Sequence, residues 1–134
     1  MHAFIIAGPD RRGGLAEIAE AIAERGINIT MLTAATAGGA GMLALTTNDD
    51  ASTRVALDGG RWAYREVELL PVTLEDLPGA LADVARRLAD AGINIELALP
   101  VATSRNGRQM TLALALSDRA AAREVLGYLA GAPS

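Results

Sequence analysis

The chain has 134 residues, the length of one domain or of two very small ones, which excludes a large multidomain enzyme. Hydrophobic residues make up 51% of the sequence and charged residues 21%, so there is enough apolar surface for a folded core. The net charge is −4, whereas nucleic-acid binding requires clustered positive charge. We therefore expect no nucleic-acid partner.

The sequence lacks most of the side chains that common enzymes use. It contains no cysteine and no lysine, and its one histidine, His2, lies beside Met1, where we expect a frayed terminus. A serine-hydrolase triad, a zinc site and Schiff-base chemistry therefore lack their components, so we expect a protein that is not an enzyme, with no cofactor and no metal. No run of 18 apolar residues is present, which predicts no membrane association and a cytoplasmic location.

The first predicted elements are a short strand over residues 3–7 and an amphipathic helix that begins after a glycine-rich loop. The helix is predicted to end at Gly26, because glycine suits the left-handed position that follows a helix. Its apolar residues have the spacing of a single buried stripe: Leu15, Ile18, Ala19, Ile22 and Ala23.

Two strands are predicted next, over residues 27–36 and 41–47. Gly38 and Gly39 lie between them and can adopt the positive φ angles of a tight hairpin, so we expect antiparallel neighbours. A second helix is predicted over residues 50–58 and a fourth strand over residues 62–66. The predicted order is β-α-β-β-α-β.

An internal repeat then divides the chain. The sequence Gly-Ile-Asn-Ile at residues 26–29 recurs unchanged at residues 92–95, which is 66 residues later. One offset without a gap is typical of a duplicated domain. The same offset relates further pairs of residues: Asp10 and Asp76, Gly13 and Gly79, Leu15 and Leu81, Ile18 and Val84, and Ile22 and Leu88.

The second copy repeats this order of elements as far as its second helix. Its predicted strands cover residues 69–74, 93–103 and 108–116, with a hairpin turn at Asn106-Gly107, and a helix capped by Asp118 runs to residue 129. Residues 131–134 are too few and too rich in breakers for a fourth strand.

The fold class predicted by this order is α+β. We expect two tandem ferredoxin-like domains, residues 1–67 and 68–134, each an antiparallel sheet with its helices on one face. The second domain is predicted to lack its last strand.

The loops before the first helix of each copy, residues 8–15 and 74–81, together with the following helix and Gly-Ile-Asn-Ile, resemble ACT domains. The resemblance covers nearly the whole chain and implies a regulatory protein that binds an amino acid or a similar metabolite. It is strongest to tandem ACT proteins without an enzyme, similar to glycine cleavage system repressor-like and stand-alone amino-acid-binding proteins. The first loop departs from the family pattern, because Arg12 stands where proline is usual and where the second copy has Pro78.

The first loop has groups suited to a free amino acid. Gly13 and Gly14 open the helix, so unpaired N–H groups and the positive end of the helix dipole can receive a carboxylate. Asp10 can accept a hydrogen bond from an ammonium group, or can instead be a helix N-cap. Arg11 and Arg12 can add an anion contact that favours an acidic or phosphorylated ligand, or can be solvated surface residues.

The second loop is predicted to be a weaker anion site, because Pro78 removes one N–H group. By resemblance, the segment after each helix faces the loop of a neighbouring ACT domain, in the same chain or in a partner chain. Each asparagine of that segment can instead bond local backbone. The other candidate ligand-binding residues are Leu15, Asn28, Ile29, Asp76, Leu77, Gly79, Ala80, Asn94 and Ile95.

The predicted strands over residues 41–47 and 108–116 have apolar residues on both faces, which indicates that a second layer covers the sheet. We therefore expect a homodimer. The alternative to a ligand-binding protein is a ligand-free ACT module that docks on a metabolic enzyme or regulator.

Overall fold

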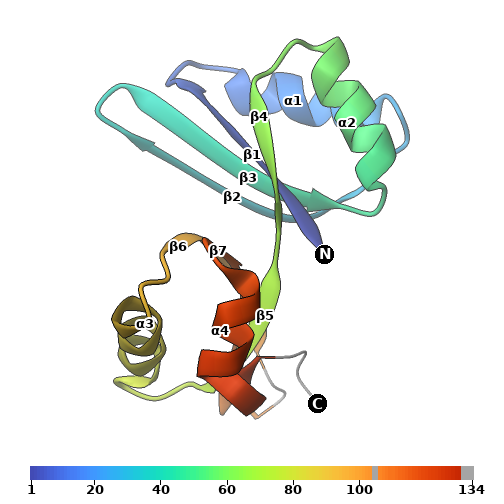
Figure 1. Ribbon diagram of the computed structural model, residues 1–134. Coiled ribbons are helices and arrows are strands. Elements are labelled where there is room, and N and C mark those ends of the chain that lie inside the picture. The colour runs from blue at the N-terminus through green and yellow to red at the C-terminus, as the bar shows by residue number, and fades with distance from the viewer. Residues whose placement is uncertain (104–105, 131–134) are drawn as a thin grey trace. The chain divides into compact units, whose positions relative to one another are not determined.

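The computed structural model describes residues 1–103 and 106–130. The chain divides into two compact units, Met1–Glu68 and Leu69–Ser134, which we call the first and the second domain (Figure 1). Among the described residues, no helix has the length and apolar character needed to cross a membrane.

The first domain has the predicted order of elements. Its antiparallel sheet has the strand order β2-β3-β1-β4, and both helices lie over one face of it (Figure 1). The ferredoxin-like prediction is confirmed for this domain. Its elements are β1 (His2–Pro9), α1 (Gly14–Ala23), β2 (Ile29–Ala37), β3 (Ala40–Thr47), α2 (Asp50–Gly59) and β4 (Tyr64–Glu68).

The core of the first domain lies between the helices and the sheet. Ile18 and Ile22 of α1 are buried there with Phe4 of β1, and each such side chain stabilises the fold by about 1.5–3 kcal/mol. The predicted helix stripe is wrong at its ends. Leu15 is 45% exposed and Ala23 is also exposed, because the sheet face covers only the middle turns of the helix.

The hairpin between β2 and β3 is formed as predicted. Gly38 and Gly39 have φ angles of 56° and 80°, which side chains other than glycine rarely adopt. The hairpin pairs Ala37 with Ala40 and extends the ladder back along both strands. It thereby fixes which residues of β2 and β3 lie at the sheet end next to the start of α1.

Strand β4 begins at Tyr64, two residues later than predicted. Arg61 has a φ angle of 58°, and the Trp62 N–H donates to the Leu57 carbonyl at 3.2 Å, so both residues still belong to the turn after α2. The Trp62 ring lies over Gly60: a Cβ atom on that glycine would be 2.0 Å from the ring. An alanine at residue 60 would therefore displace the Trp62 ring.

The N-terminal strand is ordered, and the predicted fraying of His2 is wrong. His2 pairs with Glu68 in the sheet, and its Nδ1 lies 2.5 Å from Glu66 Oε2. Arg54 Nη2 donates to the same carboxylate at 2.7 Å. Hydrogen bonds from Arg54, and secondly from His2, lower the pKa of Glu66 to about 2. The ion pairs therefore join the start of β1 to α2 and β4.

The second domain repeats the fold with three strands. Its sheet has the order β5-β7-β6. The prediction that Asp118 caps the last helix is confirmed, because its side chain accepts from the Ala121 N–H at 3.0 Å. The elements are β5 (Leu70–Glu75), α3 (Ala80–Asp90), β6 (Ile95–Thr103), β7 (Gln109–Leu116) and α4 (Arg119–Leu126), followed by a 3₁₀ turn, η1 (Gly127–Leu129).

A fourth strand is missing from this sheet in the described residues, as predicted. In its place Ala130 forms an isolated antiparallel bridge with Val72. The repeat offset relates this bridge to the pairing of Tyr64 with Ile6 in the first domain. One residue thus occupies the register of β4, while residues 131–134 and part of the predicted second hairpin, residues 104–105, lie outside the described residues.

Candidate functional site

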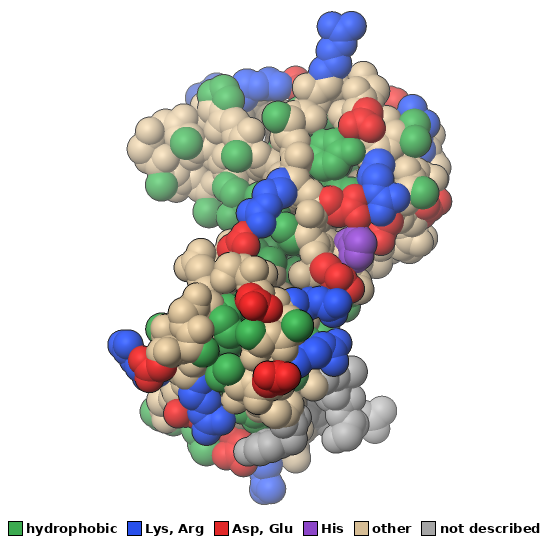
Figure 2. Space-filling view, in the orientation of Figure 1, with side chains coloured by type: hydrophobic (Ala, Val, Ile, Leu, Met, Phe, Trp, Pro, Cys, Tyr) green, Lys and Arg blue, Asp and Glu red, His purple; other side chains and the backbone are tan. Residues whose placement is uncertain are grey.

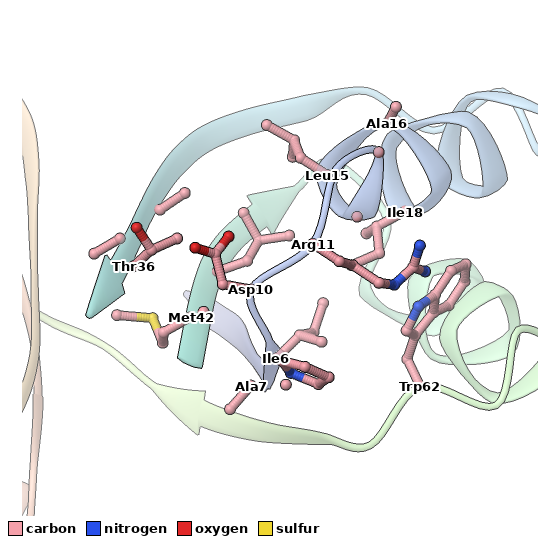
Figure 3. A pocket seen from close by; sticks show the side chains of 18 residues that line it. Ile6, Ala7, Asp10, Arg11, Leu15, Ala16, Ile18, Thr36, Met42 and Trp62 are labelled. Atoms are coloured by element: carbon pink, nitrogen blue, oxygen red, sulfur yellow. The ribbon is translucent and has the colours of Figure 1, made fainter. Parts of the chain in front are cut away.

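A cavity of about 600 Å³ opens in the first domain where β1 ends and α1 begins (Figure 3). Its walls come from the end of β1, the loop that follows, the first turns of α1, the paired ends of β2 and β3, and Trp62. The volume lies within the usual range for small-molecule sites, about 300–1,000 Å³. Of the predicted site residues, the cavity brings together Asp10, Arg11, Gly13, Gly14 and Leu15.

The start of α1, whose first residues line this cavity, has free amide groups. Gly13 is the N-cap, with a φ angle of 80° and no side-chain cap. The Gly14 N–H is not free, because it makes a long hydrogen bond of 3.4 Å to the Arg11 carbonyl. Among the described residues, none accepts a hydrogen bond from the N–H groups of Gly13, Leu15 or Ala16. These three groups can receive an anion at the positive end of the helix dipole.

Asp10 is held by its backbone while its carboxylate stays available. Its N–H donates to the Gly39 carbonyl at 2.9 Å, and its side chain has no hydrogen bond or ion pair within the described part of the chain. The alternative role as an N-cap is therefore wrong. Figure 3 shows the Asp10 carboxylate on the side of the cavity where Thr36 and Met42 lie. A carboxylate in this position can bind a cationic group of a ligand.

Arg11 also lines the cavity, but its charge is already paired. Its guanidinium makes two hydrogen bonds to the Glu17 carboxylate, Nη1 to Oε1 at 3.1 Å and Nη2 to Oε2. The hydrogen bond raises the pKa of Arg11 and lowers the pKa of Glu17, so both stay ionised at neutral pH. Arg12 is exposed and does not line the cavity. An anion contact from these two arginines stays a prediction, which would require Arg11 to share its charge between Glu17 and the ligand.

Sequence reasoning missed the strand and tryptophan walls of the cavity. The sequence predicts Trp62 in a strand, whereas its half-buried ring lies at the end of the cavity towards which the Arg11 side chain extends (Figure 3). Thr36 and Met42 lie at the hairpin end of β2 and β3. The pair Gly59-Gly60 before Trp62 was the available signal, because a glycine at that position admits a large ring against the backbone.

The glycines around the cavity leave space rather than fill it. An added Cβ atom would meet nothing within 4 Å at Gly8 or at Gly13. At Gly41 it would lie 3.8 Å from both the Asp10 Cα and the Thr36 methyl group, so these two residues flank the same point of β3. A ligand can therefore approach the backbone of the first loop closely.

The helix after the second loop starts in the same way as the helix after the first. Gly79 is the N-cap of α3 with a φ angle of 88°, and the Ala80 N–H donates to the Leu77 carbonyl at 3.2 Å. The Asp76 side chain has no hydrogen bond or ion pair within the described residues. Leu77 takes the place of Arg11 and is 60% exposed, so this loop has no equivalent of the arginine.

The Gly-Ile-Asn-Ile segments do not line the cavity. Asn28 and Ile29 lie at the end of β2 opposite to Thr36. The Asn28 N–H donates to Asn48 Oδ1 at 3.0 Å, and the Asn94 N–H donates to Ser117 Oγ at 2.9 Å. The alternative that each asparagine side chain bonds local backbone is wrong, since only their backbone groups are engaged within the described residues. A role for Asn94 and Ile95 opposite the first loop stays a prediction.

In the described ranges, no group of three or more acidic or histidine residues is placed to hold a metal ion. The visible faces of both domains show acidic and basic side chains interspersed (Figure 2).

Two repeated ferredoxin-like domains, each with a glycine-capped helix after its first strand, define the class of this protein. The sequence profile of the ACT domain matches residues 2–57 and 68–127. The chain therefore belongs to the ACT domain family and contains two tandem ACT domains. No protein with a curated description matches its sequence.

Solved structures show the same fold. Protein BT0572 from Bacteroides thetaiotaomicron is 25% identical with a TM-score of 0.73, over 93% of this chain and 85% of that one. The ligand-free regulatory subunit of aspartate kinase from Thermus thermophilus is 23% identical with a TM-score of 0.64, over 96% of this chain and 91% of that one. A putative glycine cleavage system transcriptional repressor is 16% identical with a TM-score of 0.44, over 92% and 86%, which is too low to support an argument.

Proposed function

We propose that this protein is a non-catalytic regulatory protein that binds a free amino acid in the cavity of its first ACT domain. One observation carries the proposal: an unpaired carboxylate, Asp10, and the free N–H groups of Gly13, Leu15 and Ala16 border the same cavity. A free α-amino acid carries an ammonium group and a carboxylate on the same carbon atom, so it offers both charges close together. The ACT family supports the same assignment.

The two ends of the ligand are recognised by different groups. Its carboxylate binds the free N–H groups at the start of α1, where the helix dipole adds a favourable field. Its ammonium group binds Asp10, because a charge-assisted hydrogen bond contributes more than a neutral one. Its side chain extends into the apolar part of the cavity between the sheet end and Trp62.

Binding would also act on the structure of the first domain. The ligand contacts β1, α1 and the ends of β2 and β3, so it stabilises the folded state of elements that are far apart in sequence. This stabilisation is the physical basis for passing a signal to a partner enzyme or regulator. No step in this mechanism requires a cofactor.

Thermal unfolding of the full chain with each of the common amino acids tests the proposal. A ligand present at 100 times its Kd adds about 2.7 kcal/mol to stability, which raises the midpoint by several degrees. A shift with one or a few amino acids supports a sensor. If none shifts the midpoint, the alternative of a ligand-free interaction module is favoured.

The homodimer stays a prediction. Strands β3 and β7 carry apolar residues on both faces, which supports a second layer on each sheet. Light scattering of the purified chain would give the mass of the assembly and so test the prediction.

A further inference from the structure

The cavity of the first ACT domain has two charged side chains in its wall, and their surroundings differ. Asp10 has no polar partner within the described residues, whereas both terminal nitrogens of Arg11 donate to Glu17. Only the negative charge is therefore left without a compensating partner in the described part of the chain. A cation in the ligand finds an unpaired carboxylate, whereas a second anion meets an arginine whose charge Glu17 already compensates.

The rest of the wall is almost entirely apolar. It contains aliphatic side chains from β1, α1 and β3, one thioether and the face of an indole ring, and Thr36 is the only uncharged polar side chain among the lining residues described. Such a wall favours a ligand side chain that loses contact with water on binding. The large apolar residues that matter here are Ile6, Leu15, Ile18, Met42, Leu43 and Trp62.

From this arrangement we infer that the cavity selects amino acids with apolar side chains and discriminates against acidic ones, and that Glu17 determines this specificity by holding Arg11. The inference rests on the proposed function, because it assigns the class of ligand to the same site. Glu17 does not itself line the cavity, so it acts as a positioning residue.

Two physical effects produce the selectivity. A leucine side chain buries more apolar surface on binding than the methyl group of alanine does. The difference lowers Kd about tenfold or more. An acidic side chain in the same place loses hydration and gains less from Arg11 than from an unpaired arginine, because Glu17 already compensates the charge of the guanidinium. The hydrogen bond to Arg11 also lowers the pKa of Glu17, so the pair is ionised at neutral pH, where a free amino acid is a zwitterion.

The chain contains its own reporter of this site, since Trp62 is its single tryptophan and lines the cavity. We would titrate the full chain with L-leucine, L-alanine, L-glutamine and L-glutamate and follow Trp62 fluorescence, with calorimetry as a second readout. Glutamine and glutamate have the same shape, so their comparison isolates the charge. The wild-type chain is expected to bind leucine about tenfold more tightly than alanine, and glutamate most weakly.

The variant Glu17→Gln releases the charge of Arg11 while keeping the shape of the side chain. The affinity of this variant for glutamate relative to glutamine is expected to rise about fivefold. This is the effect of attraction between the ligand carboxylate and an uncompensated Arg11 charge at about 4 Å in water. Glu20→Gln is the matched control, because Glu20 is exposed on the same helix and does not line the cavity. Circular dichroism would verify that both variants are folded.

The outcomes separate the two proposals. Glutamate binding as tightly as leucine to the wild-type chain would overturn the selectivity and leave the amino-acid sensor intact. Leucine preference with an unchanged glutamate-to-glutamine ratio in Glu17→Gln would overturn the role of Glu17. If none of the common amino acids produced any response, the proposed function would fail, and the inference with it.

Discussion

Replacing Asp10 by asparagine removes the one carboxylate available to a ligand ammonium group while keeping the size of the side chain. The Asp10 side chain is exposed and makes no hydrogen bond or ion pair in the described structure, and its backbone is held by the Gly39 carbonyl. The substitution should therefore change the free energy of unfolding by no more than about 0.5 kcal/mol.

The effect on binding should be far larger than the effect on folding. A hydrogen bond to a charged group contributes enough that its loss weakens binding about ten- to hundredfold, and the solvent-accessible position of Asp10 places the expected value near tenfold. Isothermal titration calorimetry of the wild-type and Asp10→Asn chains with the strongest amino acid from the thermal screen would measure it.

The charge-matched control is Asp90→Asn, which removes an exposed carboxylate from α3 in the second domain. The one ion pair that it makes within the described part of the chain, with Arg86 at 3.8 Å, is a surface pair that contributes little to stability. An affinity of Asp10→Asn within about twofold of the control would refute the assignment of Asp10 to the ammonium group.

Gly13→Ala should destabilise the first domain by about 1–2 kcal/mol in urea unfolding, because alanine is strained at a φ angle of 80°. The control Gly8→Ala should leave the free energy of unfolding almost unchanged. Equal effects of the two substitutions would contradict the explanation by backbone strain. Gly60→Ala should displace the Trp62 ring, shift its emission maximum and weaken amino-acid binding, and an unaltered spectrum would show that the ring does not rest on residue 60. The lowered pKa of Glu66, about 2, means that its ion pairs stabilise the fold above the unfolded pKa of about 4.3 and lose this effect as pH falls towards 2. The melting temperature of Glu66→Gln should thus lie below that of the wild type at neutral pH and approach it in acid. A difference in melting temperature that does not change with pH would argue against a stabilising role of the ion pairs.

The fold was predictable because local signals agreed with one another at every level. The glycine pairs marked the hairpin, Ile18 and Ile22 marked the buried face of α1, and the exact recurrence of Gly-Ile-Asn-Ile marked the duplication. These residues also determine the structure itself. The glycines allow the positive φ angles of the turns, and the helical spacing of the apolar residues places them on one face of the helix.

The cavity was only half predictable. The loop from Asp10 to Leu15 is contiguous in sequence, so its helix-end chemistry could be inferred. Trp62 reaches the cavity through an unusual turn at Arg61, for which the preceding Gly59-Gly60 pair is the local signal. The ends of β2 and β3 reach the cavity through strand pairing, which leaves no local signal. The pairing of Arg11 with Glu17 depends on rotamers, which no spacing rule fixes when six residues separate the partners.

At the edge of the second sheet, the lack of a fourth strand in the described residues was predictable from the sequence and the bridge that replaces it was not. The absence of a fourth strand from the described residues followed from composition alone, but the bridge between Ala130 and Val72 did not. The bridge arises because the 3₁₀ turn after α4 returns the chain to the open edge of β5 in the register that β4 has in the first domain.

The most direct test of an amino acid bound at the start of α1 is a nuclear magnetic resonance titration of the ¹⁵N-labelled full chain. The amide signals of Gly13, Leu15 and Ala16 should move together and saturate as L-leucine is added, because their free N–H groups would acquire a carboxylate partner. Leucine binding detected by calorimetry while these three signals stay fixed would contradict the account.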